Sequence, residues 1–179
     1  MVLFVRLILM GIVMPQISRT ALVPYSAEQM YQLVNDVKSY PQFLPGCTGS
    51  RVLESTPGQM TAAVDVSKAG ISKTFTTRNQ LTSNQSILMH LVDGPFKKLI
   101  GGWKFTPLSH EACRIEFHLD FEFTNKLVEL AFGRIFKELA SNMVQAFTVS
   151  RERGLQCQRR LKLSLKWRTR YPRNSIYSA

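Results

Sequence analysis

The sequence predicts an α+β fold in which a strongly curved antiparallel sheet wraps around one long C-terminal helix. Two observations on periodicity indicate this fold. From Gly46 to Phe123, several segments alternate apolar and polar residues with a period of two, as in strands with one buried face. From Asn125 onward the period is close to 3.6, which is typical of an amphipathic helix. A curved sheet that grips this helix buries every apolar face, so we expect one such domain over 14–150.

The N-terminal part of this domain is predicted to hold one strand and one helix. Residues 16–24 carry the strand. Ser26 is a good N-cap for a helix over residues 27–34, where the apolar side chains recur at helical spacing at Met30, Leu33 and Val34.

A segment bracketed by prolines follows, Ser39-Tyr-Pro-Gln-Phe-Leu-Pro-Gly-Cys47. We expect Pro41 to begin a short helix, because a first-turn residue has no use for its N–H, and Pro45 to end it. Phe43 and Leu44 would then lie on one stiff turn that could close an apolar opening. The alternative is a capped turn whose apolar side chains simply enter the core.

Five strand segments are predicted between this turn and the C-terminal helix. Four of them run over Met60 to Val66, Ile71 to Leu81, Ile87 to Leu91 and Cys113 to Phe123, and the other carries Trp103 and Phe105. Turns are expected at Ala69-Gly70 and Asn84-Gln85. The segment 113–123 alternates most regularly, with six apolar residues on one side and five polar residues on the other.

The long helix is predicted to begin after Asn125 as its cap and to continue about one turn past Val149. Its apolar stripe consists of Val128, Phe132, Ile135, Leu139, Met143 and Ala146. Gly133 costs up to about 1 kcal/mol within a helix, unless close packing requires it.

Both ends of the chain differ from the central region. Residues 1–13 are apolar apart from Arg6. This segment is too short to span a bilayer, and no signal-peptide cleavage site follows it. We therefore expect it to be an extension outside the domain, and Met14 to be the true first residue of the protein. A membrane-surface anchor is the alternative for residues 1–13.

Residues 151–179 hold nine Lys or Arg and one Glu, whereas 14–150 carry a net charge of only +2. This tail is either a basic RNA-binding extension or, as we expect, the product of a frameshift near residue 150 and no part of the fold.

Two segments together resemble the coenzyme-Q-binding family of START-like (polyketide cyclase, SRPBCC) proteins. One is the Tyr-Pro-Gln-Phe-Leu-Pro-Gly-Cys turn, and the other is Asp93-Gly-Pro-Phe-Lys-Lys-Leu, which leads into a strand with Trp103 and Phe105. The likeness runs from about Met14 to about Val149. It implies a helix-grip fold with a cavity between sheet and helix for a ubiquinone or another isoprenoid lipid, with no cofactor required. The residues expected to line the cavity are Tyr40, Phe43, Leu44, Pro45, Trp103, Phe105, Phe117, Phe121, Phe132, Phe136 and Met143.

The likeness is close enough to suggest one bacterial member of the family, the toxin of a toxin–antitoxin pair. It implies binding to the large ribosomal subunit, so that joining of the small subunit is blocked. Lys97, Lys98 and Lys104 are the candidate RNA contacts, together with Phe96, which we expect to be exposed. Holding a quinone or other lipid is the alternative function.

The sequence offers little for an enzyme or a metal site. The inward faces of the clearest strands carry no carboxylate, histidine or lysine, and Lys73 and Asp93 are the nearest candidates. His90, His110 and His118 are expected on outward faces or in a loop, and no metal-ligand spacing is present. Three cysteines without paired spacing favour a reducing, cytoplasmic setting, and a monomer is expected.

Overall fold

The structure is a computed structural model that describes the backbone of residues 16–170 and the side chains of residues 16–150. The predictions for residues 1–13, and for the side chains of 151–179, lie outside these described residues. The fold starts with β1 (Gln16–Val23), α1 (Ala27–Asn35) and a 3₁₀ helix, η1 (Val37–Gln42). The sheet continues with β2 (Cys47–Thr56), β3 (Gln59–Lys68), β4 (Ile71–Thr82), β5 (Ser86–Asp93), β6 (Phe96–Ser109) and β7 (Ala112–Phe123), and α2 (Lys126–Arg170) follows.

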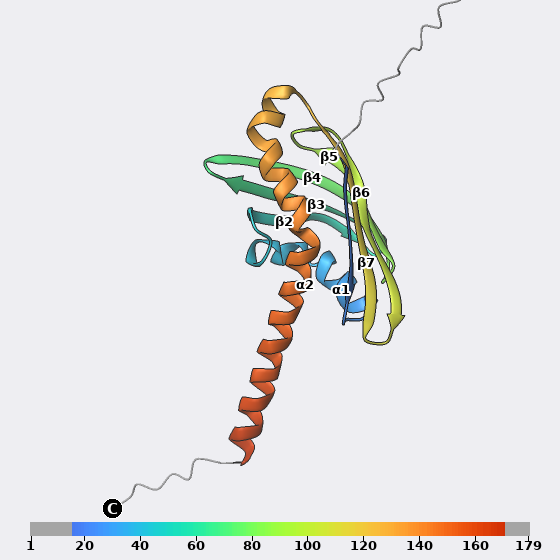
Figure 1. Ribbon diagram of the computed structural model, residues 1–179, viewed down its shortest axis with the longest axis vertical. Helices are drawn as coiled ribbons and strands as arrows, with labels where there is room; N and C mark the ends of the chain where they lie inside the picture. Colours follow the sequence, from blue (N-terminus) through green and yellow to red (C-terminus); the bar gives the residue numbers. More distant parts are fainter. Residues whose placement is uncertain (1–15, 171–179) are drawn as a thin grey trace, which may run out of the picture.

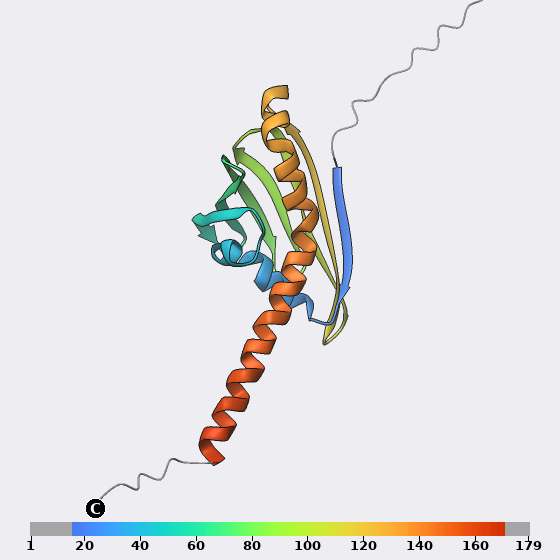
Figure 2. The ribbon, with the colours of Figure 1, turned by 60° about the vertical axis from the view of Figure 1, so that its left-hand side comes forward.

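All seven strands form one antiparallel sheet in the order β1-β7-β6-β5-β4-β3-β2. The sheet is strongly curved, and the first half of α2 lies across its concave face, with α1 and η1 beside it (Figures 1 and 2). The predicted helix-grip arrangement is therefore confirmed. Its core is the apolar face of the sheet packed against the apolar stripe of α2.

The predicted caps and turns are confirmed at several places. The Ser26 hydroxyl accepts a hydrogen bond from the Gln29 amide at 3.2 Å and the Gln29 side chain accepts one from the Ser26 amide, which makes a capping box at the start of α1. The Asn125 side chain accepts a hydrogen bond from the Val128 amide at 2.9 Å at the start of α2. Both residues of the Ala69-Gly70 turn have positive φ, as a tight hairpin turn requires.

The glycine inside α2 is explained by packing. A Cβ atom added to Gly133 would lie 3.3 Å from the ring of Phe123 on β7. The helix therefore approaches the end of β7 at Gly133, the helical residue that has no side chain. This close approach offsets the helix-propensity cost of glycine.

Two predictions about helix ends are wrong. Pro41 does not begin a helix but is the fifth residue of η1. It is the second residue of a turn in which the Phe43 amide donates a hydrogen bond to the Tyr40 carbonyl oxygen at 3.2 Å, and this position needs no N–H. The long helix does not end a turn after Val149 but continues to Arg170 and leaves the sheet, as Figures 1 and 2 show. No proline lies between Lys126, where the helix begins, and Pro172, so the backbone hydrogen bonding of the helix can continue.

Candidate functional site

The space between sheet and helix is almost completely filled. A cavity of about 30 Å³ remains beneath α2. Only apolar atoms face it, and its lining comprises Phe75, Thr77, Met89, Leu99, Phe117, Leu119, Phe136, Leu139, Ala140 and Met143. This volume would hold about one or two water molecules, whereas small-molecule sites usually measure about 300 to 1,000 Å³.

Aromatic side chains occupy the rest of this space. The ring of Phe136 on α2 lies 4.6 Å from that of Phe96 and 4.9 Å from that of Phe121, measured between centroids. Phe132 and Phe123 complete this cluster near the start of α2. Such edge-to-face contacts add to the apolar area that the rings bury, so this end of the core is tightly packed.

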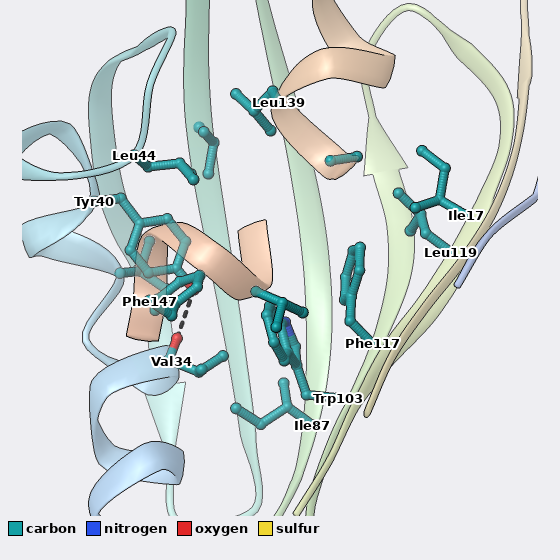
Figure 3. Packing of buried hydrophobic residues seen from close by; sticks show 14 of the residues in the cluster. Ile17, Val34, Tyr40, Leu44, Ile87, Trp103, Phe117, Leu119, Leu139 and Phe147 are labelled. Atoms are coloured by element: carbon teal, nitrogen blue, oxygen red, sulfur yellow. Dashed lines mark hydrogen bonds between the residues drawn. The ribbon is translucent and has the colours of Figure 1, made fainter. Parts of the chain in front are cut away.

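A second aromatic cluster closes the other end of the core. Phe147 of α2 is fully buried, and its ring centroid lies 5.2 Å from Tyr40, 5.1 Å from Phe43 and 5.2 Å from Trp103. Figure 3 shows Phe147 between Tyr40 and Trp103, with Leu44 next to Tyr40. Sequence reasoning missed Phe147, although it follows Met143 by four residues and so continues the apolar stripe of α2.

The residues predicted to line a cavity divide into three groups. Phe117, Phe136 and Met143 line the small cavity. Phe43 and Pro45 lie farther out, where they border a surface hollow of about 290 Å³ against α2, with Asn142, Gln145, Ala146 and Val149. The remaining six are buried in the packed core: Tyr40, Leu44, Trp103, Phe105, Phe121 and Phe132. The cavity residues that sequence reasoning missed come from β4, β5, β6, β7 and α2, because alternation marks an inward face but not which of its residues border a void.

Two ionisable side chains are buried near the Pro-bracketed turn. The Tyr40 hydroxyl donates a hydrogen bond to the Val34 carbonyl oxygen at 2.5 Å, and burial raises the pKa of Tyr40 well above its ordinary value. Burial also raises the pKa of the Cys47 thiol to about 11, although a hydrogen bond to the Gly49 backbone opposes this. Both groups are therefore protonated at neutral pH and serve packing rather than acid–base chemistry.

The candidate RNA contacts are only partly as expected. Phe96 is buried, so the expectation that it is exposed is wrong. Its ring stacks on that of Phe123, with 5.1 Å between the ring centroids. The side chain points inward because β6 begins directly after Pro95. Lys97 is exposed but forms an ion pair with Glu122 at 3.0 Å. Lys98 and Lys104 are exposed and have no carboxylate partner within 4.0 Å among the described side chains. These two lysines are therefore available on β6 to meet an anionic partner.

The convex face of the sheet carries a hollow that sequence reasoning did not find. It measures about 580 Å³ and lies over Gly101 and Gly102, between Leu88 of β5 and His118 of β7, with Lys104 at its rim. A Cβ atom on Gly102 would lie 2.1 Å from the Ile87 carbonyl oxygen, so only glycine fits where β5 and β6 approach so closely. The Gly-Gly dipeptide could have signalled a close backbone approach inside a strand.

The remaining ionisable candidates lie outside the core. Lys73 and Asp93 are exposed, His90 is half-buried, and His118 contacts Ser18 and Asp120 on the convex face. Within residues 16–150, no three His, Cys, Asp or Glu side chains converge as metal ligands would. None of the helices in the part of the chain that the structure describes has the length and apolar character needed to span a membrane.

Comparisons with known proteins agree with this fold. The sequence profile of the family described as polyketide cyclase / dehydrase and lipid transport matches residues 23–148. The ribosome association toxin RatA of Escherichia coli is 92% identical over 149 residues, which cover 83% of this chain and 94% of that protein. A mitochondrial coenzyme Q-binding protein of Xenopus laevis is 30% identical over 134 residues, or 73% of this chain and 55% of that protein. The solution structure of an 18 kDa protein from Caulobacter crescentus is 30% identical, with a TM-score of 0.62 over 80% of this chain and 99% of that one. The chain therefore belongs to the polyketide cyclase / dehydrase and lipid transport family, as its two sequence motifs predicted.

Proposed function

We propose that this protein is a ribosome association toxin, which binds the large ribosomal subunit and blocks its joining to the small subunit. The observation that carries the proposal is the 92% identity to the Escherichia coli toxin over 94% of that protein's length. Since 92% of the aligned residues are the same, we expect a surface that contacts the ribosome to be largely retained. A ribosomal partner also implies a cytoplasmic location.

The chemistry of the domain supports a binding role rather than catalysis. The cavity beneath α2 is lined by apolar atoms, so it holds no pair of groups for acid–base work. Lys98 and Lys104 are free cations on β6 and could contact phosphates of ribosomal RNA as point charges. The protein would then act by occupying a surface that the other subunit needs.

Ribosome profiles test this proposal directly. Purified protein is added to separated subunits under joining conditions, and the products are resolved on a sucrose gradient. We expect fewer joined ribosomes, with the protein in the large-subunit fraction. Unchanged joining at a protein excess, or protein found only with the small subunit, would contradict the proposal.

Lipid binding is the second candidate function. It is favoured by the apolar cavity and by the likeness to a coenzyme Q-binding protein. Since the cavity holds about 30 Å³, a quinone would have to displace side chains such as Leu139 and Met143 of α2. Mass spectrometry of organic extracts should detect a bound isoprenoid in purified protein. A Met143→Trp variant, which fills the cavity, should lose it, while Leu53→Trp on the exposed edge strand should retain it.

A further inference from the structure

Two leucines are exposed at one end of the folded domain. Leu127 and Leu130 lie in the first turns of α2, and each is 78% exposed, more than any other large apolar residue among the described side chains. They are three residues apart and therefore lie side by side on the helix. Leu130 is two residues before Phe132, which places it about 200° around the helix from the face that packs on the sheet. We call Leu127 and Leu130 the leucine ridge.

The leucine ridge lies at an extremity of the molecule, beside the turn between β5 and β6. The Thr124 amide donates a hydrogen bond to the Pro95 carbonyl oxygen at 3.2 Å, which fastens the start of α2 to this turn. Figures 1 and 2 both show the first turn of α2 projecting at this end of the sheet. Val92, near the end of β5, is a further apolar side chain at this end, and it is 49% exposed. A flat surface could therefore approach the ridge without meeting the rest of the domain.

In the ion pairs around the ridge, the cations lie outermost. The Lys126 side chain is 85% exposed, whereas that of its partner Glu129 is 33% exposed. The Lys97 side chain is 68% exposed, against 38% for its partner Glu122. Lys98 adds a cation that is free of a carboxylate among the described side chains. Asp93, the last residue of β5, is an exposed acid at the same end, so an approaching surface would meet the two leucines together with three exposed lysines and one exposed acid.

We propose that the leucine ridge docks this protein onto the surface of an anionic phospholipid bilayer. Leucine side chains gain by entering the boundary between headgroups and acyl chains, and lysines at the same level gain from anionic headgroups. RNA would use the lysines but offers no apolar layer for two leucines, so the bilayer surface accounts for both features. This inference goes beyond ribosome binding and stands or falls independently of it.

Vesicle co-sedimentation of the full chain tests the proposal. The protein should bind vesicles of phosphatidylcholine with phosphatidylglycerol and bind phosphatidylcholine alone more weakly. A double variant, Leu127→Asp with Leu130→Asp, should lower the partition coefficient by about tenfold or more. The matched control is Leu22→Asp with Leu108→Asp, two leucines that are 71% and 56% exposed toward the opposite end of the sheet, and its binding should not change. Equal binding of both double variants would overturn the proposal.

All these variants keep the basic tail, so a local measurement is needed to separate the contribution of the leucine ridge to vesicle binding from that of the tail. Hydrogen exchange of the amides of 126–131 should slow when phosphatidylglycerol vesicles are added. Vesicle binding with unchanged exchange at 126–131 would show that other residues hold the membrane, and would overturn the proposal. The proposal is also overturned if the Leu127→Asp and Leu130→Asp variant loses ribosome binding but keeps vesicle binding, because the ridge would then be a ribosome contact. If a variant outside the leucine ridge loses ribosome binding but keeps vesicle binding, the result concerns the proposed toxin function and leaves the membrane proposal intact.

Discussion

The Tyr40 hydroxyl is hydrogen-bonded to the Val34 carbonyl oxygen at 2.5 Å, which ties the Pro-bracketed turn to the end of α1 (Figure 3). Val34 belongs to the last turn of α1, where carbonyl oxygens have no partner within the helix. The same tyrosine ring packs against Phe43 and Phe147, so one side chain joins α1, the turn and α2.

Replacing Tyr40 with phenylalanine should therefore destabilise the protein. The Tyr40→Phe variant keeps the ring but leaves a buried carbonyl oxygen without its partner, which costs about 1 to 3 kcal/mol. Urea unfolding measures the loss. The control is Tyr31→Phe, since the Tyr31 ring packs against Phe105 and its hydroxyl has no hydrogen bond among the described residues. Equal losses in the two variants would show that the Tyr40 hydrogen bond is not what stabilises the turn.

Stability should fall at alkaline pH in a way that depends on Cys47. Burial raises the pKa of its thiol from 9.0 to about 11, so the unfolded chain loses this proton before the folded chain does. The thiol's contribution is therefore fully present below 9.0 and is lost as the pH rises toward about 11. Urea unfolding of wild type and Cys47→Ala should show a steeper alkaline decline in the wild type. Burial also raises the pKa values of Tyr40 and Cys113, and both residues remain in both proteins. Parallel declines would refute the prediction.

Gly102 should not tolerate any side chain. In Gly102→Ala the new Cβ would lie 2.1 Å from the Ile87 carbonyl oxygen, and backbone atoms of a central strand cannot move aside cheaply. We expect a loss of about 3 kcal/mol or more, or failure to fold, as measured by thermal unfolding. Gly58→Ala is the matched control, because its Cβ would meet no atom within 4 Å. If the two variants unfold at the same temperature, the close approach of β5 and β6 is not rigid.

Ribosome binding should depend on the free lysines of β6. Replacing Lys98 and Lys104 with glutamine removes two phosphate contacts, so the slope of log affinity against log salt should fall by about 0.7 to 0.9 per lysine. The affinity should fall most at low salt, as sedimentation with purified large subunits would report. Lys68→Gln is a suitable control, since this lysine is held by Glu138 at 2.7 Å. An unchanged slope in the double variant would exclude these lysines as RNA contacts.

The two ends of the chain should be dispensable for the fold. A protein of residues 14–153 should melt close to the full chain, because it retains every residue of α2 that packs on the sheet among the described side chains, the last of which is Phe147. It should also keep its ribosome affinity at physiological salt. A large loss of affinity with unchanged melting would show instead that the basic segment after residue 150 binds the partner, and that the frameshift interpretation is wrong.

The sequence by itself determined the elements of this fold and their faces. The regular alternation over 113–123 identified the inward residues of β7, and the spacing from Val128 to Met143 identified the inner face of α2, because each reflects a local backbone period. The capping residues Ser26 and Asn125 were identifiable because a cap bonds to amides only a few residues away.

Tertiary structure decided what the site is. The sequence showed that large aromatics face inward, but whether they leave a cavity depends on how Phe136 and Phe147 pack against strands far away in the chain. Phe96 follows a turn signal and was expected outside, yet the pairing of β6 with β7 turns it against Phe123. Exposure of Lys98 and of the leucine ridge likewise depends on neighbours brought close by folding. Local periodicity specifies which face of an element is apolar, whereas volumes and exposure arise only when distant elements meet.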